Sequence, residues 1–251
     1  MRLIFENDKN LQEDLLFQSE FNKLKVETGD IIVTSSNSFM GSIVKMFTSS
    51  KMTHVGIIIN YDKEGNIIFG NSNDIFITLI LECIAESKYN WLTKKISNGV
   101  GLYGFSNSAK QLNLLKRSKK EFKERLNSED IYKFINEFIE KPISNYIKFV
   151  AIWLGFFIDK DSEIICSEFC YKFIEKFMVK NDKNIKHHSM VHPRYFTDKN
   201  TVVHNNREII YNNTDYYNAI YLLLIVFGVF FIISIILLCI PCIIKKIYIK
   251  N

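Results

Sequence analysis

Two short segments far apart in the chain carry the residue types that a thiol nucleophile needs. Residues 53–59 place His54 at the start of an apolar run with the character of a β-strand. Residues 164–169 place Cys166 where a short apolar run leads into an amphipathic helix. A cysteine, and a histidine that serves as its base, are the two parts of such a nucleophile. In this chain the histidine comes first.

The sequence around Cys166 predicts a helix that begins at this cysteine. The polar residues 159–163 indicate a loop, and Ser167 and Glu168 fall in the first helical turn. The positive end of the helix dipole favours a thiolate at this position. The N–H groups of a first turn have no partner within the helix and can hold a developing oxyanion. The alternative is that Cys166 is a small buried apolar residue.

His54 and Glu82 are the polar members of two predicted strands. His54 shares one strand face with Gly56, which we expect to leave open space for the close approach of another element. Glu82 interrupts the apolar run 75–84, and a buried carboxylate must be paired or hydrogen-bonded. A hydrogen bond from the imidazole to Glu82 would fix the tautomer of His54. The alternatives are a structural histidine and a half-exposed edge glutamate.

The elements that must position these residues change in character along the chain. Strands are predicted over residues 31–33, 52–60, 67–69, 75–84 and 100–105, and helices over 39–47, 127–140, 146–157 and 166–178, with a short one after Pro193. Gly29 and Asp30 form a turn signal before the first strand. Because strands come first and helices follow, the pattern favours an α+β fold.

The C-terminal segment is apolar enough to cross a membrane. No charged residue occurs between Tyr216 and Ile244, and about 20 apolar residues span a bilayer as a helix. We therefore predict a transmembrane helix over 219–244, a juxtamembrane linker over 206–218 and a short basic tail over 245–251. The alternative is a buried helix of a soluble protein.

The two ends of the chain give opposite indications of orientation. The first ten residues are charged at Arg2, Glu6 and Lys9, and no apolar signal segment follows them. This favours a cytosolic main domain that is anchored by the C-terminal helix. Lys245 and Lys246 favour the opposite orientation, because basic flanks prefer the cytoplasmic side. The expected partners are the lipid bilayer and a peptide or lipid acyl substrate.

Charge and cysteine content exclude two classes of protein. The net charge is +5, but Lys245, Lys246 and Lys250 lie in the basic tail and the rest is nearly balanced. No element gathers basic residues, so nucleic-acid binding is not expected. Cys239 and Cys242 belong to the apolar tail region. The remaining three cysteines are unevenly spaced, which excludes a disulfide framework and favours a reducing compartment.

No metal or cofactor is expected. His187, His188 and His192 lie close together in sequence but lack a carboxylate or cysteine at ligand spacing. Cys166 and Cys170 lack the second pair that a four-ligand site needs. The chain also has no glycine-rich loop for phosphates.

Several segments, taken in order, resemble the permuted papain-like, NlpC-type cysteine hydrolases, and within them the YaeF/YiiX-like and poxviral branch. They are GDII at 29–32, THVGI at 53–57, LEC at 81–83, CSEF at 166–169 and VHPRYF at 191–196. The resemblance implies a circularly permuted papain-like fold over 26–205, a small antiparallel sheet packed on helices, with 1–25 as an N-terminal extension. By position, it makes Cys166 the nucleophile, His54 the base and Glu82 the residue that orients the histidine.

Three functions remain open at this point. The first is a membrane-anchored thiol hydrolase that cleaves an amide, ester or thioester bond through an acyl-enzyme. The second is a lipid acyltransferase or phospholipase of the same superfamily, which a membrane anchor would favour. The third is a catalytically silent viral membrane scaffold that keeps the fold. The CSEF segment favours the hydrolase, because lipid-processing relatives usually differ around the cysteine.

Overall fold

The chain divides into two compact units, Met1–Asn213 and Thr214–Asn251. The computed structural model describes residues within the first unit. They are residues 2–6, 9–15, 18, 21–22, 25–36, 41–42, 44–45, 52–70, 72–105, 109–116, 127–139, 141, 164–178, 191, 193–197 and 206–212.

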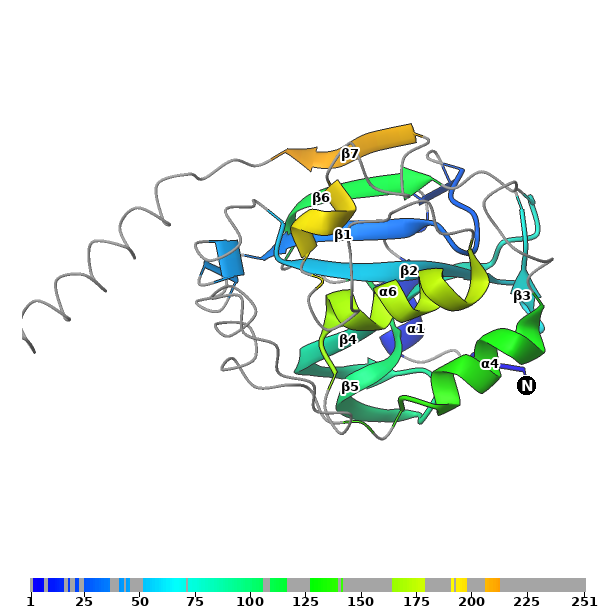
Figure 1. Ribbon diagram of the computed structural model, residues 1–251. Coiled ribbons are helices and arrows are strands. Elements are labelled where there is room, and N and C mark those ends of the chain that lie inside the picture. The colour runs from blue at the N-terminus through cyan, green and yellow to red at the C-terminus, as the bar shows by residue number, and fades with distance from the viewer. Residues whose placement is uncertain are drawn as a thin grey trace, which may run out of the picture. The chain divides into compact units, whose positions relative to one another are not determined.

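An antiparallel sheet is the central element of the first unit (Figure 1). Its strands are β1 (Ile31–Ser36), β2 (His54–Tyr61), β3 (Ile67–Ile68), β4 (Ile77–Asn90), β5 (Lys95–Tyr103), β6 (Ala109–Lys116) and β7 (Asn206–Asn212). They follow the order β5-β4-β2-β1-β6-β7, and β3 pairs with β2. The helices whose bounds are described are α1 (Lys9–Leu15), α4 (Ser128–Asn136), α6 (Cys166–Phe177) and the 3-10 helix η3 (Pro193–Thr197). The predicted α+β class is thus confirmed.

The two faces of the sheet bury different apolar layers. One face carries Val55, Ile57 and Ile59 of β2 into the larger core cluster, together with residues of α4 and α6. The other face carries Ile58 of β2 into a smaller cluster. This second cluster also contains Phe21, Val26, Ile32 and Ile80. The alternation follows from the two-residue period of a strand, in which neighbours point to opposite faces.

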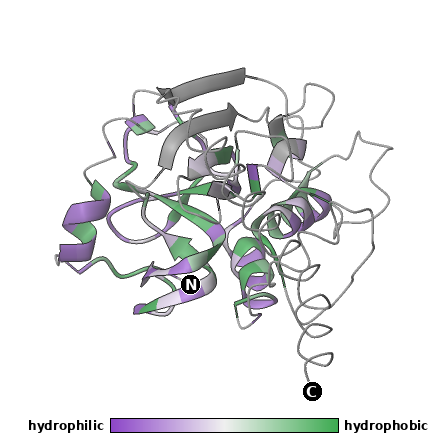
Figure 2. Ribbon diagram, turned by 90° about the vertical axis from the view of Figure 1, so that its left-hand side faces the viewer, coloured by the Kyte–Doolittle hydropathy of each residue, from purple (hydrophilic) through white to green (hydrophobic). Residues whose placement is uncertain are grey.

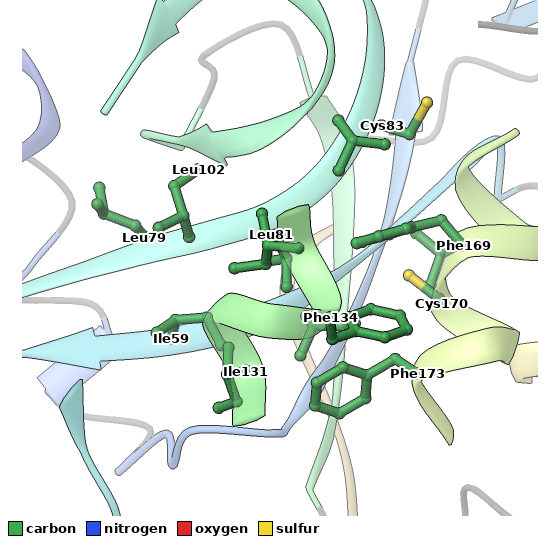
Figure 3. Close-up of a cluster of buried hydrophobic side chains, with 14 of the residues drawn as sticks. Ile59, Leu79, Leu81, Cys83, Leu102, Ile131, Phe134, Phe169, Cys170 and Phe173 are labelled. Atoms are coloured by element: carbon green, nitrogen blue, oxygen red, sulfur yellow. The ribbon is translucent and has the colours of Figure 1, made fainter. Parts of the chain in front are cut away.

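Helix α6 lies against β2 and β4 through an apolar stripe. Phe169, Cys170 and Phe173 on this stripe are fully buried, and Figure 3 shows them directed toward Phe134 of α4 and Leu81 of β4. Spacing of three and four residues puts such side chains on one side of a helix. The helices accordingly carry both hydrophobic and hydrophilic residues, whereas the central strands are largely hydrophobic (Figure 2).

Most predicted elements occur near their expected positions, but three strands differ from the prediction. The strand predicted over 75–84 is β4, which continues to Asn90. The prediction ended too early because the residues after Ile84 are largely exposed and carry no apolar signal. Strand β6 was not predicted at all. Strand β7 falls within the predicted linker and pairs with β6. Leu3 and Leu11 of the predicted N-terminal extension also lie in the main core.

Some predictions fall outside the described residues. They are the helix over 146–157, most of that over 39–47, the histidines His187, His188 and His192, and the C-terminal segments 219–244 and 245–251. In the part of the chain that is described, no helix is both long and apolar enough to cross a bilayer. Within the same residues, no cluster of three metal-ligating side chains occurs.

Candidate active site

The structure brings His54 and Glu82 into direct contact. Gly56 of β2 lies opposite Glu82 of β4, so His54, two residues before Gly56, is on the same face as the glutamate. Nε2 of His54 donates to Oε2 of Glu82 at 2.7 Å. The glutamate side chain is only 7% exposed, whereas the histidine side chain is 22% exposed. Glu82 is therefore a buried acceptor, and His54 retains an accessible edge.

Gly56 allows β2 and β4 to pack closely beside this pair. A Cβ atom at Gly56 would lie 2.4 Å from Cγ2 of Ile80 and 3.3 Å from Cβ of Glu82. The expected open space next to the histidine is therefore filled by Ile80. Because Gly56 has no side chain, Ile80 and Glu82 of β4 can lie close to the backbone of β2.

Cys166 reaches the imidazole from the start of α6. The N-cap residue Ile165 is extended, with φ −112° and ψ 160°, and Cys166 is the first helical residue. Its side chain hydrogen-bonds the His54 ring. The pairing of β2 with β4 ends at Gly56 and Glu82, so His54 lies just past the last paired residue. The nucleophile candidate thus meets the histidine where the two strands separate.

The charges around His54 favour its protonated form. Burial alone would lower the pKa of His54, but the negative charges of Cys166 and Glu82 and hydrogen bonds to both raise it from 6.5 to about 10. At neutral pH the ring is therefore a cation. With Glu82 on Nε2, the nitrogen left for Cys166 is Nδ1.

The other two described thiols are in a different environment. Cys83 on β4 donates to the carbonyl of Ile164 at 3.7 Å, and Cys170 is fully buried in α6. Burial, followed by the nearby negative charges, raises the pKa of both thiols well above the usual value. Neither is described in contact with a histidine. Of the three described cysteines, Cys166 is thus the one with a histidine beside it.

The first turn of α6 is held by contacts outside the helix. Ser167 donates its hydroxyl to the carbonyl of Val191 at 2.8 Å. Tyr171 packs edge-on against Tyr195 of η3, at 5.7 Å between ring centroids. The segment that precedes and forms η3 therefore fixes the helix start. The N–H groups of such a first turn have no carbonyl partner inside the helix.

The turn at Gly29 and Asp30 anchors β1 to β2, as the sequence indicated. Gly29 has a φ of +98°, a conformation that glycine adopts without strain. Its N–H donates to the carbonyl of Ile58 at 2.9 Å, and the N–H of Ile58 donates back to Asp30 at 2.8 Å. The central strand that carries His54 is thus held on both sides.

A group of residues beside Glu82 was not singled out from the sequence. Gly101 of β5 lies directly opposite Glu82, and the buried side chain of Asn90 lies over it. Tyr103 is close by, and burial raises its pKa to about 12, with a smaller contribution from the charge of Glu82. The two glycines of β5, Gly99 and Gly101, are the one signal of close packing that the sequence contains here.

The site can therefore place the Cys166 sulfur beside an imidazole ring that a buried carboxylate orients. The same three residue types serve nucleophilic acyl transfer in thiol enzymes. No protein-family model matches the chain, and no curated protein matches it either. Its function must therefore be inferred from its own residues.

Proposed function

We propose that this protein is a thiol hydrolase with a permuted papain-like fold, in which Cys166 is the nucleophile, His54 the acid–base group and Glu82 the orienting residue. The observation that supports it most is the 2.7 Å contact between Nε2 of His54 and Oε2 of Glu82, with Cys166 hydrogen-bonded to the same ring. The order of the three residues along the chain and their places on a strand, a strand and a helix start match the family that the sequence resembles.

The first half of the proposed reaction forms an acyl-enzyme. The proton of the Cys166 thiol resides on His54, and the sulfur attacks the carbonyl carbon of an amide, ester or thioester. The negative charge on the carbonyl oxygen is stabilised by N–H groups of the first turn of α6. His54 then donates its proton to the leaving group as the carbon–heteroatom bond breaks. A thioester on Cys166 remains.

The second half releases the acyl group. His54, now neutral, takes a proton from a water molecule that attacks the thioester carbonyl. The carbon–sulfur bond breaks, the carboxylic acid leaves, and the proton on His54 again neutralises the Cys166 thiolate. Glu82 keeps Nε2 protonated in both halves and presents Nδ1 to the reacting atoms.

We further propose that the apolar segment 219–244 anchors this site at a membrane, with the catalytic domain on the cytosolic side. The absence of charge between Tyr216 and Ile244 supports it. An anchored site draws its substrates from the membrane surface, either peptides or the acyl chains of lipids.

Trapping the acyl-enzyme tests the function. The full chain, in detergent micelles, would be mixed with p-nitrophenyl acetate, a peptide thioester or phosphatidylcholine vesicles and quenched in acid. The intact mass should increase by one acyl group, and tryptic mapping should place it on Cys166. Cys166→Ala and His54→Ala should lose the adduct, and Cys170→Ala should keep it.

The substrate that gives the adduct distinguishes the open alternatives. An adduct from the peptide thioester alone supports a peptidase-like hydrolase. An adduct from the phospholipid vesicles indicates the lipid acyltransferase or phospholipase. A chain that forms no adduct with any of the three, although it is folded, contradicts the enzyme and leaves the scaffold.

A further inference from the structure

The hairpin between β4 and β5 folds back over the outer edge of β5. Leu102 lies on this edge, and both of its backbone groups bond to residues of the hairpin. Its carbonyl accepts from the N–H of Trp91 at 2.9 Å, and its N–H donates to Oδ1 of Asn90 at 3.3 Å. Asn90, the last residue of β4, is thereby brought back to the level of Glu82 on the same strand.

The amide of Asn90 occupies the place that a side chain at position 101 would take. A Cβ atom at Gly101 would lie 2.2 Å from Nδ2 and 2.8 Å from Oδ1 of Asn90. Gly101 is the direct cross-strand partner of Glu82. Side chains at such positions have Cβ atoms about 4.5–5.5 Å apart. The amide is therefore an immediate neighbour of the glutamate, on the face that carries His54.

Asn90 is held in this place by hydrogen bonds at both ends of its amide. Oδ1 also accepts from the N–H of Leu92 at 3.0 Å, and Nδ2 donates to Oγ of Ser97 at 3.4 Å. The residue is 1% exposed. The hydroxyl of Tyr103 lies beside the Asn90 amide and donates to the carbonyl of Gly99 at 3.2 Å. The amide is thus fixed.

We propose that Asn90 is a positioning residue for Glu82, and that its amide, seated on Gly101, keeps the carboxylate turned toward His54. This inference rests on the proposed function of the His54–Glu82 pair. A glutamate side chain has three rotatable torsions, and ordering it costs conformational entropy. A bare glycine across the strand would give the carboxylate room to turn away from the imidazole. The fixed amide removes that room.

The titration of His54 measures whether Glu82 is in place. The ring would be observed by NMR in histidine-labelled full-length protein, and thermal unfolding would be followed in parallel. Asn90→Ala removes the amide and leaves the space on Gly101 open, so the carboxylate can turn away and the pKa of His54 should fall by about one unit, as expected when an opposite charge moves away. Asn98→Ala, at an exposed position of β5, should leave the pKa unchanged.

A double variant separates positioning from stability. In Asn90→Ala/Gly101→Ala the new methyl group fills the place that the amide has left. The pKa of His54 should return toward its wild-type value, although the protein stays less stable because the amide hydrogen bonds are lost. If Asn90→Ala does not fold, Ser97→Ala, which frees Nδ2 without adding volume, should lower the pKa of His54 by a smaller amount.

Two results would overturn the role of Asn90. One is a folded Asn90→Ala protein, or failing that a folded Ser97→Ala protein, with an unchanged His54 pKa. The other is a double variant without recovery. A wild-type His54 that titrates near 6.5 would instead contradict the His54–Glu82–Cys166 arrangement itself, and with it the proposed function.

Discussion

At the scale of single residues, the proposed chemistry depends on one histidine between a buried carboxylate and the Cys166 side chain. Glu82 is buried, and its Oε2 lies 2.7 Å from Nε2 of His54. Cys166 hydrogen-bonds the same ring. The raised pKa of His54 follows from these two groups, and it makes the ring a proton donor at neutral pH. A histidine without them would titrate near 6.5 and be mostly neutral.

The pKa of His54 makes the stability of the fold depend on pH. A group whose pKa rises on folding binds more protons in the native state, so stability falls with pH between its two pKa values. The pKa of His54 rises from 6.5 to about 10 on folding. The free energy of unfolding should therefore decrease from about pH 6.5 to about pH 10, as measured by urea titration.

Glu82→Gln should make this decrease smaller, because one of the two negative charges that raise the pKa of His54 is lost. A fall of one unit in the His54 pKa would reduce it by about 1.4 kcal/mol. Glu86→Gln, at an exposed position of the same strand, is the matched control and should keep the full wild-type decrease. An equal total decrease in the wild type and Glu82→Gln would argue against the pair.

At the scale of the elements, the contact of β2 with β4 positions the glutamate. Gly56→Ala would put a methyl group 2.4 Å from Cγ2 of Ile80. Such overpacking costs about 1–3 kcal/mol, and it should displace Glu82 as well, so the reactivity of Cys166 should fall. Ile80→Ala in the same chain removes the clashing atom and should restore reactivity. Reactivity that is unchanged in Gly56→Ala would contradict this view of the strand pair.

Helix α4 packs against α6 through the ring of Phe134, which lies 5.4 Å from that of Phe169, and it begins at the N-cap Asn127. Oδ1 of Asn127 accepts from the N–H of Asp130 at 2.9 Å. Asn127→Ala should lower the free energy of unfolding by about 1 kcal/mol, whereas Asn127→Ser should keep most of it. Urea denaturation checks both. Equal losses in the two variants would show that the side-chain acceptor is not what stabilises the helix start.

The sequence pattern predicted the elements with a strong local signal. Strand β2 and helix α6 each have an apolar run with clear period, and Glu82 stood out as a carboxylate in an apolar strand. Strand β7 did not stand out, because Asn206, Arg207 and Glu208 give it a polar start. The role of Asn90 was not predictable either. It depends on the hairpin folding back onto β5, which is a tertiary contact with no local signal.

At the scale of the whole molecule, the sheet and its helices form one compact unit and the apolar segment belongs to another. We expect the second unit to carry membrane attachment. The double variant Ile232→Arg/Ile236→Arg puts two charges in the segment, each unfavourable by about 3 kcal/mol at a helix centre. It should release the protein from membranes on carbonate extraction.

The matched control for this variant is Ser234→Ala, which keeps the segment apolar and should stay in the membrane pellet. The thiol reactivity of Cys166 should be the same in all three proteins, because the site lies in the first unit. Retention of the arginine variant in the pellet would contradict anchoring by 219–244.

The measurement that tests the central claim most directly is the competition among the three buried thiols of the first unit. Folded full-length protein would be treated with limiting iodoacetamide at pH 7, and each cysteine would be quantified by mass spectrometry. Cys166 should be alkylated first, well ahead of Cys83 and Cys170, and His54→Ala should remove its advantage. A Cys166 that reacts no faster than the other two in the folded wild type would contradict the account.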